Sequence, residues 1–220
     1  MVCAIMSLRR AAHLNRLGGR LEEDQMKRVL VFTMVLLGFA WSTASAQTTD
    51  AGYADALTPS LASAARTMHV TMRRNIVEAA EAVSASEYSF RPTPEIRTFA
   101  QLVGHVINAN WFFCSQAKQE RPPNSANHEA LTDKAALVKA LHDAMSYCDG
   151  AYEATTDANF NQPVQMQAGV GMGPASTVRG AILTFNTAHD NEHYGNIVVY
   201  MRLKGHTPPS TSREAAARRK

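Results

Sequence analysis

Cysteine is scarce in this chain of 220 residues, and the three that occur, Cys3, Cys114 and Cys148, form no CxxC pair. The sequence therefore offers neither a dithiol redox motif nor a zinc ribbon. The glycine-containing run at residues 169–173 lacks the GK[ST] ending of a phosphate-binding loop, and no strand precedes it as a dinucleotide-binding fingerprint requires. We interpret this run as a flexible connection. Strand patterns are short throughout, and only residues 164–168 could pair briefly.

Long hydrophobic runs are also missing, apart from one near the amino terminus. Lys27 and Arg28 precede an apolar run over residues 29–41, and small residues follow it at positions 44–46. The run is too short for a permanent membrane helix, which needs about 20 residues. These three parts are typical of a secretory signal peptide. We therefore expect residues 26–46 to be removed, and the product to be periplasmic or secreted without a stable membrane anchor.

An excess of charge of one sign disappears once the first 46 residues are set aside. The chain has 22 Lys+Arg and 19 Asp+Glu, and residues 1–46 hold six of the former and three of the latter, which leaves 16 of each. A neutral chain gives no electrostatic reason to expect nucleic acid or an anionic membrane as a partner. The basic residues 218–220 lie at the terminus, where a solvated tail is the simplest interpretation.

Helical periodicity dominates what is present. Pro92 and Pro94 end the first periodic stretch, Thr98 is a suitable N-cap for the second, and Gly205 with Pro208 ends the last. Together these signals predict an all-α fold, a four-helix bundle. The predicted helices are residues 61–83, 98–119, 132–156 and 176–204.

The expected layout of the chain has four parts. Residues 1–25 are polar, and Met26 stands where a signal peptide usually starts, so we expect a non-native extension before it. The signal peptide covers residues 26–46, and the bundle covers residues 47–209. A disordered basic tail is expected over residues 210–220.

The predicted fourth helix carries two histidines, His189 and His193, spaced by four residues. This spacing puts both imidazoles on one helix face, about 6 Å apart along the axis, where both can reach one metal ion. The apolar stripe of the helix has gaps at these two positions, so we expect both side chains in the core. Histidines satisfied by a neighbouring hydroxyl or carbonyl are the alternative. The stripe consists of Val178, Ile182, Phe185, Ile197 and Tyr200.

A third imidazole in the predicted second helix, His105, would complete the three-ligand set of a catalytic zinc site. A surface position is the alternative for this residue. Asn108, Asn110 and Asn186 lie near the histidines along their helices and could orient a water or a ligand. Asp190 and Glu192 flank the ligands but point to other faces, so no general base and no catalytic residue is identified. The other histidines after residue 46 have no comparable context, and they are His69, His128, His142 and His206.

The chain resembles the DinB superfamily. The resemblance lies in YSFRPTPEIRTF at residues 88–99, QLVGHV at 101–106 and HDNEHYGNIVVYMRLKG at 189–205. It implies a helical bundle of up-down-down-up order. It also implies one divalent metal ion, zinc or nickel, on His105, His189 and His193. Many members carry HHRGQ at the end of the pair where this chain has EHYGN, so substrate contacts from that arginine and glutamine are not carried over.

Several hypotheses for function follow from the resemblance and the residues. The first is a metal-dependent hydrolase or transferase that acts on a small molecule. The second is a metal-binding or stress-related bundle without catalysis, and the third is a bundle without metal. Family members that use low-molecular-weight thiols work in the cytoplasm, so export argues against that chemistry. The partners we expect are a small-molecule substrate and a second copy of the chain in a homodimer.

A disulfide between Cys114 and Cys148 is expected if the helix order is that of the family. Cys114 lies 16 residues after Thr98, and Cys148 lies 16 residues after Thr132. The two cysteines would be level if the second and third helices run parallel, and an exported protein could then oxidise them. Residues 120–131 can make the return connection, since twelve extended residues reach roughly 40 Å. Two separate buried thiols are the alternative.

Overall fold

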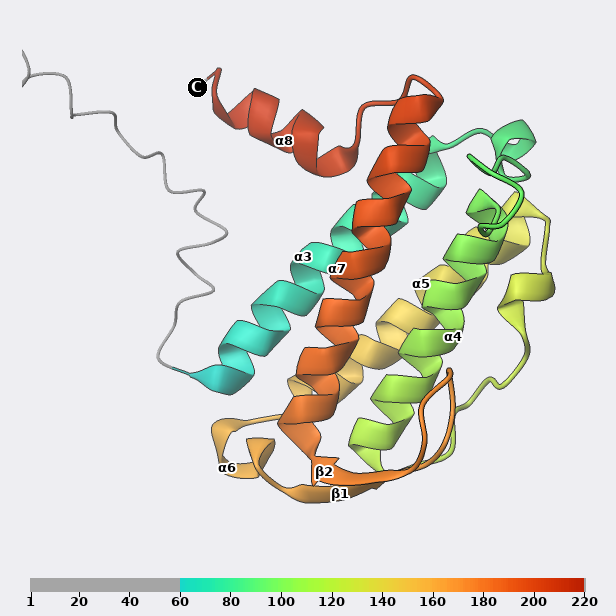
Figure 1. Ribbon diagram of the computed structural model, residues 1–220. Coiled ribbons are helices and arrows are strands. Elements are labelled where there is room, and N and C mark those ends of the chain that lie inside the picture. Colours follow the sequence, from blue (N-terminus) through green and yellow to red (C-terminus); the bar gives the residue numbers. More distant parts are fainter. Residues whose placement is uncertain (1–59, 220) are drawn as a thin grey trace, which may run out of the picture. The chain divides into compact units, whose positions relative to one another are not determined.

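The computed structural model describes residues 60–219, and this part of the chain is mostly helical (Figure 1). The extension at 1–25 and the signal peptide at 26–46 lie outside the described residues. Four long helices differ from the predicted stretches by at most three residues at any end. They are α3 (Leu61–Ala82), α4 (Phe99–Lys118), α5 (Lys134–Glu153) and α7 (Arg179–Leu203).

Shorter elements connect these helices or follow them. The 3-10 turn η1 (Ala85–Glu87) follows α3, and the turn η2 (His128–Ala130) lies between α4 and α5. Between α5 and α7 come the single turn α6 (Asp157–Phe160) and the strands β1 (Pro163–Met166) and β2 (Ala175–Val178), and α8 (Pro209–Ala217) ends the described part. None of the described helices has both the length and the apolar content that crossing a bilayer requires.

The helix that carries His105 begins at a capping box, as the sequence predicts. The Thr98 hydroxyl accepts from the Gln101 backbone N–H at 3.1 Å, and the Gln101 side chain accepts from the Thr98 N–H at 2.9 Å. The next long helix starts at Lys134, two residues later than expected, because Asp133 is its N-cap and accepts from the Ala136 N–H at 2.8 Å. Such caps satisfy backbone donors that a helix leaves unpaired in its first turn.

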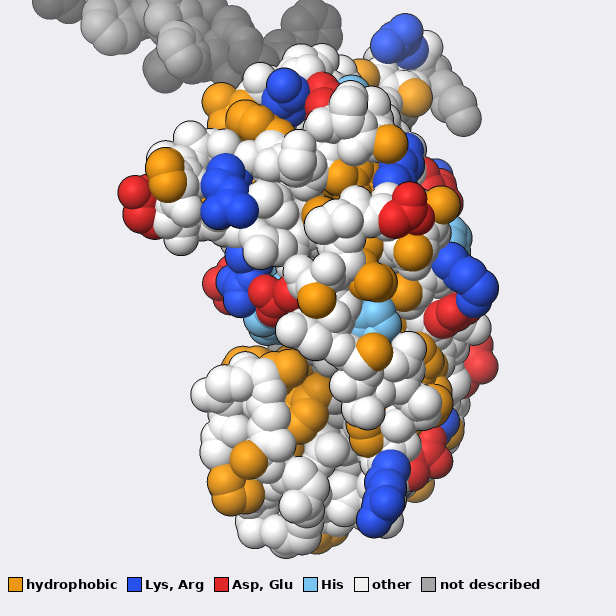
Figure 2. All heavy atoms as spheres, turned by 90° about the vertical axis from the view of Figure 1, so that its right-hand side faces the viewer, with side chains coloured by type: hydrophobic (Ala, Val, Ile, Leu, Met, Phe, Trp, Pro, Cys, Tyr) orange, Lys and Arg blue, Asp and Glu red, His pale blue; other side chains and the backbone are white. Residues whose placement is uncertain are grey.

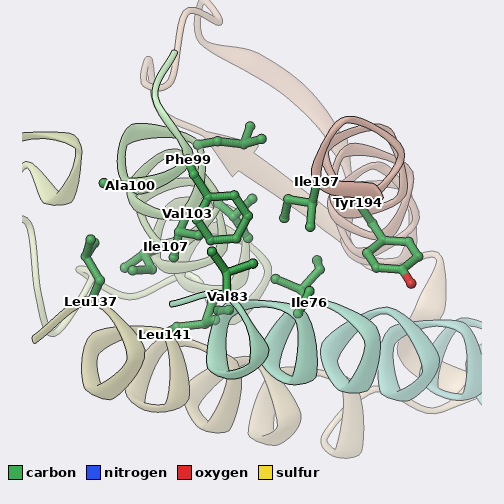
Figure 3. Packing of buried hydrophobic residues seen from close by; sticks show 14 of the residues in the cluster. Ile76, Val83, Phe99, Ala100, Val103, Ile107, Leu137, Leu141, Tyr194 and Ile197 are labelled. Atoms are coloured by element: carbon green, nitrogen blue, oxygen red, sulfur yellow. The ribbon is translucent and has the colours of Figure 1, made fainter. Parts of the chain in front are cut away.

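Each long helix packs against two others, because α4 contacts α5 and α7, and α3 contacts the same two helices. The apolar core fills the space between them, and Figure 3 shows aliphatic side chains from α3, α4, α5 and α7 pointing toward one another. The completely buried side chains of this core include Ile76, Val103, Leu141 and Ile197. Each fully buried aliphatic side chain of this kind contributes about 1.5–3 kcal/mol. This packing fixes α4 against α7, the two helices that carry the three histidines.

A Cys114–Cys148 disulfide links α4 to α5, with the two Cα atoms 5.3 Å apart. Both cysteines are completely buried in a second cluster that includes Phe113, Tyr152 and Leu183. The bond therefore lies in the interior, next to the face of α4 that meets α7.

The expected flexible connection before α7 contains a two-stranded antiparallel hairpin with Val164 opposite Thr177. Its tip is a tight turn in which Gly169 and Met172 exchange backbone hydrogen bonds of 3.0 and 2.8 Å. The hairpin is tied to the end of α4, because the Gln116 side chain accepts from the Gln167 N–H at 2.7 Å. Four-residue strands leave too short a pattern to predict from sequence alone.

Residues 209–217 form the helix α8, whereas the sequence analysis expects a disordered tail from residue 210. Pro209 is buried, and the Tyr194 hydroxyl donates to the Ser210 hydroxyl at 2.8 Å. Arg213 pairs with Glu78 and with the Asn75 side chain on α3. These contacts with the bundle stabilise a segment whose own composition does not require order.

Candidate metal centre

The three predicted histidines come together between α4 and α7. One ring nitrogen from each of His105, His189 and His193 lies within 4.8 Å of the other two. The Nε2 atoms of His189 and His193 are 3.1 Å apart. Metal–nitrogen bonds of 2.0–2.1 Å in tetrahedral geometry place two ligand nitrogens roughly 3.3 Å apart. The residues present therefore fit one metal ion with little side-chain movement.

The electrostatics of the pair on α7 favour neutral, metal-ready imidazoles. Burial, followed by the neighbouring His193 and His105, lowers the pKa of His189 from 6.5 to about 3. Burial, followed by His105, lowers the pKa of His193 to about 4. A divalent ion needs the unprotonated ring as its ligand, so neither histidine has to lose a proton near pH 7. The Nδ1 atoms of both rings are buried and have no hydrogen-bond partner among the described residues.

The ring of His105 is held by a carboxylate that sequence reasoning did not identify. Glu129, in the turn η2, lies with its Oε1 atom 2.8 Å from Nδ1 of His105, and its Oε2 atom accepts from Nε of Arg97 at 3.0 Å. Burial alone would raise the pKa of Glu129, but its hydrogen bonds to Arg97 and His105 hold it below its usual value. Glu129 thus holds the His105 ring from behind while it is paired with Arg97. No motif marks it, since it reaches the site from a loop 24 residues away.

Asn108, which the sequence analysis places beside the histidines, acts on the same turn. Its Oδ1 accepts from the backbone N–H of His128 at 3.0 Å and lies 2.8 Å from Nδ1 of that ring, and its Nδ2 donates to Asn127 at 3.2 Å. None of these contacts is with the three clustered histidines. Asn108 therefore supports the turn that carries Glu129.

Asn186 and Asn110, the other two candidate asparagines, lie in a buried polar network that includes Asp190 and Tyr152. Asn186 donates to Asn110 and to the Tyr152 hydroxyl, each at 3.2 Å. Asn110 donates to a carboxylate oxygen of Asp190 at 2.8 Å, and the second oxygen of Asp190 has no partner among the described residues. Burial, only partly offset by Asn110, raises the pKa of Asp190 to about 7.

The buried face of α7 differs from the predicted apolar stripe. Phe185 is 47% exposed, and His189 is half-buried at the edge of the helix contact, while His193 is 7% exposed. Buried positions between Ile182 and Ile197 include polar side chains, and three of these pair with α4 or α5, namely Asn186, Thr187 and Asp190. Because these polar residues replace apolar ones, the pattern of hydrophobic residues misplaced the face by part of a turn.

The histidines without a predicted role lie outside this cluster. His69, His142 and His206 each have a ring nitrogen within 3.0 Å of a carboxylate oxygen, from Asp149, Glu81 and Glu87 respectively. Their partners explain their placement without a metal ion.

The centre is accessible from one side. The His105 side chain is 16% exposed. The Phe113 ring borders His189, with 5.7 Å between the ring centroids, and Phe185 packs against Phe113 at 5.3 Å. Figure 2 shows a hollow at the left edge of the molecule, with charged and histidine side chains above it and hydrophobic side chains below.

The fold and the cluster define a mostly helical protein whose three histidines could hold a metal ion. The family model of the DinB superfamily matches residues 68–197, and the chain belongs to this family. The sequence is 25% identical over 142 residues to the uncharacterized protein YjoA of Bacillus subtilis (strain 168), covering 63% of this chain and 88% of that protein.

Two solved structures are similar in fold. A DinB-like protein from Bacillus cereus ATCC 10987 has a TM-score of 0.55 at 16% identity, with 64% of this chain and 90% of that chain covered. The YjoA structure from Bacillus subtilis has a TM-score of 0.50 at 23% identity, with 65% and 92% covered. At these identities the likeness concerns the fold alone.

Proposed function

We propose that this protein binds one divalent metal ion, zinc or nickel, on His105, His189 and His193 and acts as a hydrolase or transferase on a small molecule. The observation that carries the proposal is the convergence of three ring nitrogens within 4.8 Å from two helices. Membership of the DinB superfamily supports it. A bound ion with an open position would polarise a substrate or lower the pKa of a bound water.

The chain's own residues would do the binding and the positioning. Packing of α4 on α7 holds the ligand rings together, and Glu129 fixes the ring of His105. The ring of Phe113 lies beside His189 and packs against Phe185, and it would limit water on that side.

A metal-binding bundle without catalysis is the second candidate, and one observation favours it. Glu129, the carboxylate that contacts a clustered histidine, is already engaged by His105 and Arg97. Glu192 is exposed, and Asp190 faces the buried network with Asn110. A general base beside the metal is therefore not evident among the described residues, and structure or stress protection would be the role of the ion.

Export and helix order are further parts of the proposal. The disulfide between Cys114 and Cys148 supports an oxidising compartment, since such bonds persist in the periplasm and outside the cell. It also supports the up-down-down-up order, because α4 and α5 follow one direction in Figure 1 and their cysteines lie level. A small-molecule substrate and a homodimer remain the proposed partners. Intact mass of protein recovered outside the cytoplasm tests cleavage after Ala46.

Catalysis is tested by comparing zinc- and nickel-loaded protein with the His193→Ala variant on a panel of small esters and amides. The proposal predicts turnover by the loaded protein that the variant lacks. Tight metal binding with equal background turnover in both proteins would favour the non-catalytic alternative. Absence of metal binding would reject both.

A further inference from the structure

We propose that Glu129 is a positioning residue for the metal centre, held in place by Arg97 and by the turn η2. This inference rests on the proposed metal binding and adds to it the residue that orients one ligand. Its basis is the 2.8 Å contact between the Glu129 carboxylate and Nδ1 of His105.

The contact fixes which nitrogen of His105 can bind a metal. The same carboxylate is paired with the Arg97 guanidinium at 3.0 Å, and a carboxylate in such a pair accepts hydrogen bonds, so Nδ1 of His105 is the donor to Glu129. Its Nε2 atom then has the free lone pair that a metal ligand needs. A carboxylate behind a ligand histidine fixes the tautomer and the ring orientation and makes the ring a stronger ligand.

His105 differs in this respect from the other two ligands. The Nδ1 atoms of His189 and His193 have no partner among the described residues, and their rings are placed by the helix they share. His105 comes from a different helix and must be aimed at the pair. The carboxylate orients the His105 ring toward the pair and places one negative charge close to the site of a divalent cation.

The turn that carries Glu129 is held tightly against α4. A Cβ atom on Gly104 would lie 2.3 Å from the carbonyl oxygen of His128, so only glycine permits this approach. Asn108 binds the His128 N–H one turn further along the same helix. Arg97, which precedes the N-cap of α4, donates to the second carboxylate oxygen of Glu129. Three residues from one helix and its N-terminal flank therefore fix the Glu129 side chain.

Another histidine–carboxylate pair, on the surface, lacks the supporting contacts that hold Glu129 in place. Glu81 also lies 2.8 Å from a histidine nitrogen, that of His142, but these two side chains are 49% and 47% exposed. Exposed pairs of this kind contribute little and do not restrict a ring. Glu81 therefore provides a matched control for Glu129.

The test measures zinc affinity by competition with a chromogenic chelator for the wild type and for Glu129→Ala, Glu129→Gln and Glu81→Gln. We expect Glu129→Ala to weaken zinc binding about 10–100-fold, as is typical for such partners. Glu129→Gln keeps an acceptor oxygen without the charge and is expected to fall between Glu129→Ala and the wild type. Glu81→Gln is expected to bind as the wild type does. Unfolding curves of the metal-free proteins separate a loss of affinity from a loss of fold.

A second measurement reads the tautomer directly. In the metal-free wild type, ¹⁵N-detected imidazole spectra are expected to show His105 protonated at Nδ1, and Glu129→Ala is expected to lose that preference. Unchanged zinc affinity in Glu129→Ala, or a wild-type His105 protonated at Nε2, would overturn the inference. A wild type that binds no zinc would instead reject the proposed function, and the tautomer result would still stand alone.

Discussion

The Nε2 atom of His193 faces the Nε2 atom of His189 at 3.1 Å, one turn apart on the same helix. Burial lowers the pKa of both rings, to about 4 and about 3, so neither carries a charge near neutral pH. Two neutral imidazoles whose Nε2 atoms lie this close can share one cation as ligands. His105 from α4 completes the set.

The stability of the metal-free protein should fall with acidification. The unfolded state protonates His189 and His193 near their ordinary pKa of 6.5, whereas the folded state resists until about pH 4 and about pH 3. Unfolding therefore takes up protons in this window, and stability is complete above pH 6.5 and is lost toward pH 4. Denaturant titrations at pH 7 and pH 5 check this, with a His189→Gln/His193→Gln variant as the flatter control. If the free energy of unfolding fell equally from pH 7 to pH 5 in both proteins, the explanation would be contradicted.

Asp190→Asn should change stability in the opposite pH sense. The pKa of this fully buried carboxyl is raised from 3.8 to about 7, so its protonated form contributes fully below pH 4 and its contribution is lost as pH rises to 7. Relative to the wild type, the variant is expected to gain roughly 4 kcal/mol at most between pH 4 and pH 7. The same denaturant titrations measure it. A difference that does not depend on pH would show that Asp190 ionises normally.

Gly104→Ala should disturb the turn η2 and, through it, the metal centre. The added methyl group would meet the backbone of His128 at 2.3 Å, which α4 and the turn can relieve only by moving apart. A loss of about 1–3 kcal/mol is expected from such overpacking, together with weaker zinc binding. Gly150→Ala on α5 is the control, because its Cβ would meet nothing within 4 Å and alanine favours a helix by up to about 1 kcal/mol. Thermal unfolding and chelator competition would report both effects.

The Cys114–Cys148 disulfide should be detectable and should stabilise the protein. It closes a segment with a sequence separation of 34, for which the stabilisation is about 2–4 kcal/mol. Thiol titration of denatured, unreduced mature protein is expected to find no free cysteine, and reduction is expected to lower the unfolding midpoint. Two free thiols per chain would refute the bond and remove its support for the parallel arrangement of α4 and α5.

Local patterns account for what the sequence predicts well. Helix caps, prolines and apolar periodicity place the four long helices, and the four-residue spacing of His189 and His193 is itself a local feature. Glu129 reaches His105 from a loop, and no periodicity records a contact of this kind. The sequence places Asp190 on another face than the histidines, but it does not predict the burial of Asp190, because that burial depends on Asn110 of another helix. Tertiary contacts likewise explain the hairpin and α8.

The most direct test of the metal centre is the metal content of purified mature protein by elemental analysis. The wild type and the control His142→Ala should contain about one equivalent of zinc or nickel after loading and desalting, because His142 pairs with Glu81 away from the cluster. His105→Ala, His189→Ala and His193→Ala should each retain only a small fraction of it. Full metal occupancy in these three variants, or no metal in the wild type, would contradict the assignment of the site.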